Sequence, residues 1–138
     1  MGATTYRIMA EFAAQGEPGT ESLNAAQKYI VSSTLTDPLG WPNTTIIDGD
    51  LHQSVARLKE SGATLRTMGS LSLCRSLLVA GPADRFDVVV FPVITGATGR
   101  DNIYRGSPDV MLELLQTLDG RLQLLEYRPT VLDGPPGT

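Results

Sequence analysis

Residues Thr64–Arg105 read TLRTMGSLSLCRSLLVAGPADRFDVVVFPVITGATGRDNIYR. Thr64–Met68 is predicted as a strand, which runs directly into Gly69-Ser70. A helix is predicted over Leu71–Val79, because its apolar residues recur on one side at helical spacing. Phe86–Ile94 is the most strand-like segment of the chain. Strands separated by single helices are typical of an α/β fold with parallel pairing and right-handed crossovers.

The N-terminal half continues this alternation of helices and strands. Apolar spacing predicts a helix over Thr5–Ala14, ended by glycine and proline. Lys28–Ser33 and Thr44–Ile47 are short, β-branched runs that predict strands. A second helix is predicted over Leu51–Ser61, with Asp50 as its N-cap.

The last third allows two interpretations. Ser107-Pro108-Asp109 is typical of a helix start, with a helix then running through Leu118. Alternatively, Asp119-Gly120 separates the apolar runs Val110–Leu118 and Leu122–Tyr127, which is the pattern of a hairpin. We favour the hairpin, and therefore expect an α/β fold with a mixed, mostly parallel sheet, flanking helices and a C-terminal antiparallel hairpin.

Length and composition exclude several classes of protein. The 138 residues, of which 41% are hydrophobic and 19% charged, fit one folded domain, expected over residues 1–128, with a loose tail over 129–138 that is rich in proline and glycine. The net charge of −4 gives no basic surface for nucleic acid, and no apolar run is long enough to cross a membrane. One cysteine, Cys74, and one histidine, His52, predict neither a disulfide nor a metal site. We expect a reduced, cytoplasmic protein.

Three stretches point to anion binding. Gly69-Ser70 lies between a predicted strand and helix, where free N–H groups and a glycine favour a phosphate, although the same dipeptide also makes an ordinary turn. Gly2–Thr5 precedes another predicted helix, and Ser32–Thr34 ends the first strand with three hydroxyls. In an open α/β sheet, ligands bind beyond the carboxyl ends of the strands. Acid–base residues are poorly marked: His52 is expected to be solvated and Cys74 to be a small core residue.

Thr64–Arg105 also carries a family resemblance, through Met68-Gly69-Ser70, Leu77-Leu78, Phe91-Pro92-Val93 and the glycine turn 96–99. It resembles the reductase domain of the bifunctional riboflavin-biosynthesis deaminase–reductase family, which is related in fold to dihydrofolate reductase. Gly2–Tyr6 is similar to the family's Gly-Arg-x-Thr-Tyr block, and Lys28–Leu35 to its Lys-Tyr-Val-Val-Ser-Arg-Thr-Leu block.

The resemblance implies a dihydrofolate-reductase-like fold and an NADPH-dependent reductase of a pteridine- or pyrimidine-like heterocycle, with NADH not excluded as the cofactor. It also implies a homodimer. It leaves the catalytic residue unassigned and implies no metal. The residues that it assigns to cofactor binding are Gly2, Thr4, Thr5, Ser32, Ser33, Thr34, Gly69, Ser70, Leu71 and Ser72.

The sequence also departs from the family pattern. Ala3 and Ser33 stand at two positions where the family often has arginine. The resemblance begins at the Gly2 block, so the family's first strand and loop are expected to be missing. These departures favour an alternative, in which the chain is a non-catalytic remnant of the fold that binds a nucleotide or self-associates.

Overall fold

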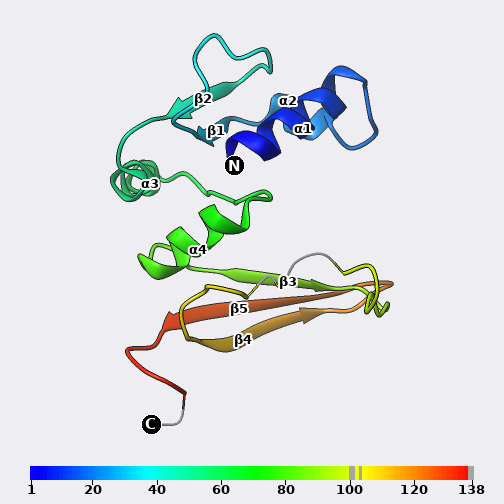
Figure 1. The fold of residues 1–138 in the computed structure, drawn as a ribbon, viewed down its shortest axis with the longest axis vertical. Coiled ribbons are helices and arrows are strands. Elements are labelled where there is room, and N and C mark those ends of the chain that lie inside the picture. Colours follow the sequence, from blue (N-terminus) through cyan, green and yellow to red (C-terminus); the bar gives the residue numbers. More distant parts are fainter. Residues whose placement is uncertain (100–101, 103, 137–138) are drawn as a thin grey trace. The chain divides into compact units, whose positions relative to one another are not determined.

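The structure is a computed structural model that describes residues 1–99, 102 and 104–136. It divides into two compact units, Met1–Cys74 and Arg75–Thr138. The order of elements is shown in Figure 1. They are α1 (Ala3–Ala14), α2 (Glu21–Ala25), β1 (Lys28–Val31), β2 (Thr44–Ile47), α3 (Leu51–Glu60), α4 (Leu71–Val79), β3 (Phe86–Val90), β4 (Val110–Leu118) and β5 (Gln123–Val131).

In the first unit, β1 pairs with β2 in parallel, with Lys28 opposite Thr44 and Val31 opposite Ile47. The other edge of β1 is taken by the start of the chain: the Val31 N–H donates to the Met1 carbonyl at 2.9 Å, and Gly2 forms a parallel bridge with Val31. Parallel pairing puts the carboxyl ends of β1 and β2 at the same edge. α1 begins at that same edge, because its N-cap, Gly2, bridges to Val31, the last residue of β1.

The core of the first unit is a small cluster around Tyr6, Ile30 and Trp41, all of them buried. The Tyr6 and Trp41 rings lie 6.3 Å apart between centroids in a tilted arrangement. The Trp41 Nε1–H donates to Asn24 Oδ1 at 2.6 Å, which satisfies the one polar atom of the indole. Tertiary contacts of this kind hold α2, whose five residues are too few to form a stable isolated helix.

Lys28 is the buried cation of this core. Its side chain is 4% exposed, and its Nζ donates to the carbonyls of Leu23 and Ala26 at 2.7 Å each. Nζ also lies 4.6 Å from the centroid of the Trp41 ring, within the range of a cation–π contact. Burial lowers the pKa of the Lys28 ammonium, while these contacts compensate its charge. Lys28 therefore holds the end of α2 and does not reach the site described below.

Replacing Lys28 with methionine is expected to lower the free energy of unfolding by about 1–3 kcal/mol, because two carbonyls lose a charged donor while the apolar volume is largely kept. Urea denaturation followed by the fluorescence of Trp41, the sole tryptophan, measures this change. An unchanged unfolding midpoint would show that the two hydrogen bonds contribute nothing net.

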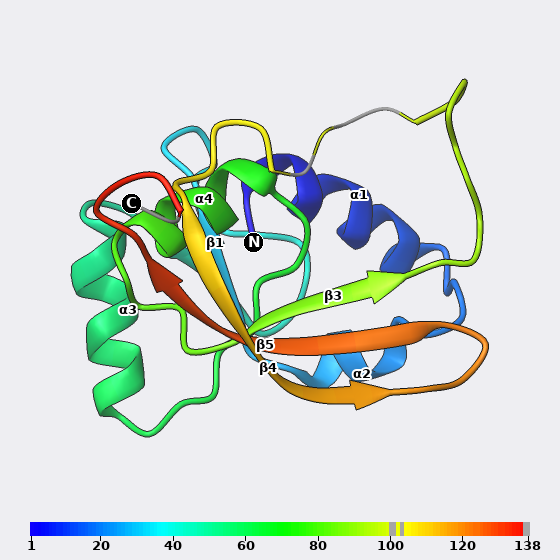
Figure 2. The same cartoon turned by 90° about the horizontal axis from the view of Figure 1, so that it is seen from below.

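The second unit is built on an antiparallel sheet in the order β3-β5-β4. Figure 2 shows β5 running between the other two strands. β4 and β5 form the predicted hairpin, with Val110 opposite Val131 and Leu118 opposite Leu124. A bulge between Leu114 and Gln116 shifts the register within it. The hairpin prediction is thus confirmed, and the helical alternative for this segment is wrong. Alternating apolar residues on two neighbouring runs outweigh the helix-start signal that precedes them.

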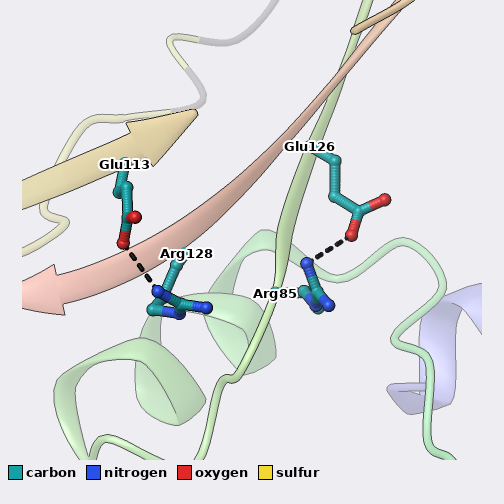
Figure 3. Close-up of polar contacts among 4 residues, drawn as sticks. All are labelled: Arg85, Glu113, Glu126 and Arg128. Atoms are coloured by element: carbon teal, nitrogen blue, oxygen red, sulfur yellow. Dashed lines mark hydrogen bonds and ion pairs between the residues drawn. The ribbon is translucent and has the colours of Figure 1, made fainter. Parts of the chain in front are cut away.

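The two faces of this sheet differ in chemistry. The pairing puts Val88 and Leu125 on one face together with Phe86 and Tyr127. The opposite face carries two ion pairs, drawn in Figure 3: Arg85–Glu126 at 2.6 Å and Arg128–Glu113 at 2.8 Å. Glu113 and Arg128 are more than half exposed, so their pair contributes little to stability.

The sequence predicts the fold class and most elements correctly. The structure is a mixed α/β fold with a parallel pair, flanking helices and an antiparallel C-terminal sheet. The helix predicted over Leu71–Val79 has those bounds, and the other two predicted helices are confirmed within two residues at each end. The helix α2 was not expected from the sequence.

Three predicted strands need correction. Thr64–Met68 is irregular; its apolar residues Leu65 and Met68 are three positions apart, which does not fit the period of two of a strand. Phe86–Ile94 stops at Val90, because Pro92 has no N–H for a ladder and the Val93 N–H closes a tight turn onto the Phe91 carbonyl at 2.8 Å. Lys28–Ser33 stops at Val31, after which the Ser32 hydroxyl holds a turn.

The ends of the chain add two observations. β5 continues through Val131, beyond residue 128, where the tail was expected to begin. Within the described residues, no helix has the length and apolar character needed to cross a membrane.

Candidate functional site

A groove of about 450 Å³ lies at the carboxyl ends of β1 and β2. Its lining comes from three chain segments: the first turn of α1, the residues that end β1, and the residues that end β2. The lining residues are Ala3, Val31, Ser32, Ser33, Thr34, Ile47, Asp48 and Gly49. This is the edge at which an open α/β sheet binds its ligands.

The turn after β1 is held by one serine. Ser32 Oγ accepts hydrogen bonds from the backbone N–H groups of Thr34 at 3.1 Å and Leu35 at 3.0 Å. That hydroxyl is therefore committed to the turn. The side chains of Ser33 and Thr34 are exposed beside it, and their hydroxyls lie at the groove. The turn presents two hydroxyl groups to whatever binds there.

The turn after β2 brings a carboxylate to the same groove. Asp48 directly follows β2, and Gly49 has φ +79° with open space where a Cβ would stand. The neighbouring Asp50 is occupied, because its Oδ1 accepts the Gln53 N–H at 2.8 Å as the N-cap of α3. Asp48 is thus the acidic side chain that the groove offers to a ligand.

The Gly69-Ser70 turn lies directly against the first turn of α1. Gly69 and Ser70 both have positive φ, +59° and +54°. A Cβ built on Gly69 would stand 2.6 Å from Thr5 Oγ1, and one built on Gly2 would stand 2.9 Å from Ser70 Oγ. The two segments therefore approach closely only because both positions are glycine.

The first turn of α1 leaves its backbone donors without a side-chain cap. Gly2 is the N-cap and makes no side-chain hydrogen bond there, so the N–H groups of the first turn are available to an anion. The Gly2 carbonyl accepts the Tyr6 N–H at 2.9 Å, which starts the helix in regular geometry. The Gly69-Ser70 turn packs against this start, with the Ser70 side chain facing Gly2 and the Thr5 side chain facing Gly69.

The structure brings most of the predicted site residues to this region of the first unit, in two groups. Ser32, Ser33 and Thr34 line the groove. Gly2, Thr5, Gly69 and Ser70 form the close contact beside it, and Ser72 Oγ lies 3.4 Å from Ser70 Oγ. Thr4 and Leu71 have exposed side chains that do not line the groove.

Asp48 and Gly49 line the groove but were not predicted as site residues from the sequence. Their signal was present, because Asp-Gly directly follows a predicted strand, at the same kind of position as Ser32–Thr34. In the sequence, Asp48-Gly49 marks the end of the predicted strand Thr44–Ile47. The rule that ligands bind at carboxyl ends applies equally to both strands and would have found it.

Other candidate chemistry stays outside the groove. His52 is exposed on the first turn of α3, as expected. Cys74 is half-buried, with its Sγ 3.5 Å from Thr67 Oγ1. Across the described ranges no three histidine, cysteine or acidic side chains come together to hold a metal ion.

Comparisons with known proteins agree with this fold. The family model of the RibD C-terminal domain matches residues 1–118. A crystal structure of a Shewanella sp. PV-4 protein, provisionally assigned to riboflavin biosynthesis, superposes with a TM-score of 0.68. It is 17% identical, and the match covers 94% of this chain and 72% of that one. No curated protein matches the sequence.

Proposed function

Because the chain belongs to the RibD C-terminal domain family of reductase-type domains, we propose that it is an NAD(P)H-dependent reductase of a pteridine- or pyrimidine-like heterocycle. The observation that carries this proposal is that three chain segments meet at one edge of the sheet. They are the start of α1, the turn Ser32–Thr34 after β1 and the turn Gly69-Ser70. A dinucleotide needs such a set, since it presents a pyrophosphate and two riboses in a row.

The residues fit a dinucleotide. The uncapped N–H groups of α1 suit the pyrophosphate, because a helix N-terminus combines free donors with a partial positive charge. Gly2 and Gly69 allow the start of α1 and the Gly69-Ser70 turn to lie this close together. The groove suits an adenosine ribose, which the hydroxyls of Ser33 and Thr34 would orient. The nicotinamide supplies the hydride, and the protein supplies binding and orientation.

Titration of the chain with NADH and NADPH tests this proposal. Calorimetry is expected to give saturable binding of at least one of them, with a dissociation constant on the order of 1 μM to 1 mM, the usual range for enzyme ligands. Silence with both at millimolar concentration would contradict the proposal and favour the remnant interpretation. If the chain binds a dinucleotide but no pteridine or aminopyrimidine oxidises the bound dinucleotide, the chain is a nucleotide-binding module and not a reductase.

We also propose that two copies associate through the sheet of the second unit. In that sheet β3 and β4 are the outer strands, and several of their apolar side chains are strongly exposed. Covering them with a second copy removes apolar surface from water, and two-fold dimers are the commonest oligomers of soluble proteins. On the face that carries Phe86 and Tyr127, these side chains are Val90, Leu112 and Leu114. A cytoplasmic location fits the single cysteine.

A further inference from the structure

The groove combines one carboxylate with hydroxyl groups and no cation. Its polar side chains are those of Ser32, Ser33, Thr34 and Asp48, and no lysine or arginine is among the described residues that line it. Within the described part of the chain, the Asp48 carboxylate has no hydrogen-bond or ion-pair partner. It is therefore free to accept hydrogen bonds from a ligand.

The two reduced nicotinamide cofactors differ only at the ribose that this groove would hold. NADH has a free 2′-hydroxyl there, which donates a hydrogen bond to a carboxylate. NADPH has a 2′-phosphate, which carries negative charge and is best held by an arginine fork. The Asp48 carboxylate and a 2′-phosphate at about 4–5 Å would repel each other, and this repulsion is larger in a groove than in open water.

The start of α1 does not change this balance. Ala3 lines the groove, and the partial positive charge of the helix N-terminus attracts phosphate. Both cofactors, however, bring the same pyrophosphate to that position. The helix therefore raises the affinity for both of them, and the side chains that face the ribose decide between them.

Resting on the proposed function, we infer that the groove selects the dinucleotide with a free adenosine 2′-hydroxyl, NADH, and that Asp48 is the residue that determines this specificity. Ser33 and Thr34 add hydroxyl groups that suit either a diol or water. Neither supplies the positive charge that a 2′-phosphate requires.

Calorimetric titration with ADP-ribose and 2′-phospho-ADP-ribose tests this inference without any redox reaction. The full chain is expected to bind ADP-ribose at least about tenfold more tightly, the factor that a single repulsive charge pair typically produces. Asp48→Asn is expected to reduce that ratio to near one, and Asp48→Arg to reverse it. Asp37→Asn is the matched control, because Asp37 is exposed nearby in sequence and does not line the groove.

The outcomes separate the two proposals. Binding of neither ligand overturns the proposed function and this inference with it. Binding of both, with the 2′-phosphate form equal or tighter, overturns the specificity alone and leaves the reductase proposal standing. A ratio unchanged in Asp48→Asn shows that Asp48 is not the determinant. The unfolding midpoint of each variant, followed by Trp41 fluorescence, establishes that the variant is folded.

Discussion

Replacing Gly69 with alanine is expected to abolish dinucleotide binding and to lower the free energy of unfolding by about 2–5 kcal/mol. Two physical effects add. Gly69 has φ +59°, which costs a residue with a Cβ about 1–2 kcal/mol. The new Cβ would also stand 2.6 Å from Thr5 Oγ1, and overpacking of this kind costs about 1–3 kcal/mol. To avoid this overlap with Thr5, the Gly69-Ser70 turn would have to move away from the start of α1.

Gly16→Ala is the matched control for this variant. Gly16 has a similar backbone angle, φ +70°, but nothing lies within 4 Å of its would-be Cβ. It should lose only the conformational part of the stability, about 1–2 kcal/mol, and keep binding unchanged. Equal losses in both variants would show that the approach to Thr5 is unimportant.

A double variant isolates the contact itself. Thr5→Ala removes the Oγ1 that a Cβ on Gly69 would meet first. If the overlap causes the loss, Gly69→Ala together with Thr5→Ala should be more stable than the sum of the two single changes predicts. Urea midpoints of the four proteins give the coupling energy, and calorimetry with NADH gives the loss of affinity. Strict additivity would contradict the close-contact explanation.

The elements of this fold were predictable where the local signal was complete. Leu71–Val79 has apolar spacing and a clear start and stop, and the helix has those bounds. Glu21–Ala25 has no such signal, because its helix depends on Lys28 and Trp41, which follow it in the chain. The strand prediction for Thr64–Met68 was wrong for a different reason. A strand needs a neighbouring strand to pair with, and no described strand pairs with this segment.

The site was predictable in parts but not as an assembly. Gly69-Ser70 and Ser32–Thr34 were recognisable from their composition, because glycine and hydroxyls next to element ends are typical of anion sites. Their meeting depends on contacts between residues far apart in the chain, such as Gly69 with Thr5. Asp48 was recognisable in the same way, as a polar residue directly after a predicted strand, but its place beside Ser33 and Thr34 depends on the parallel pairing of β1 and β2, which brings the two strand ends to one groove.

The largest effect on assembly is expected from Val90→Lys. Val90 is 40% exposed at the end of β3, an outer strand of its sheet. We expect the unmodified chain to sediment at twice its mass of 14.8 kDa at micromolar concentration. A lysine in the covered surface would have to lose its hydration without a partner, which costs several kcal/mol. The variant should therefore sediment as a monomer or fail to fold.

Two further variants make this result interpretable. Leu114→Lys places a charge on the same face of the sheet, because Leu114 is opposite Tyr127, and Tyr127 is opposite Phe86 on the face of Val90. Leu114 is 53% exposed, so this change should preserve the folded chain and still separate the copies. Ala56→Lys adds the same charge at an exposed position of α3 and should leave the dimer intact. A folded, unmodified chain at monomer mass would refute the dimer outright. A dimer that survives both sheet variants would exclude this face as the interface. In a symmetric dimer each variant buries two lysines, one from each copy, and an apolar interface does not tolerate them.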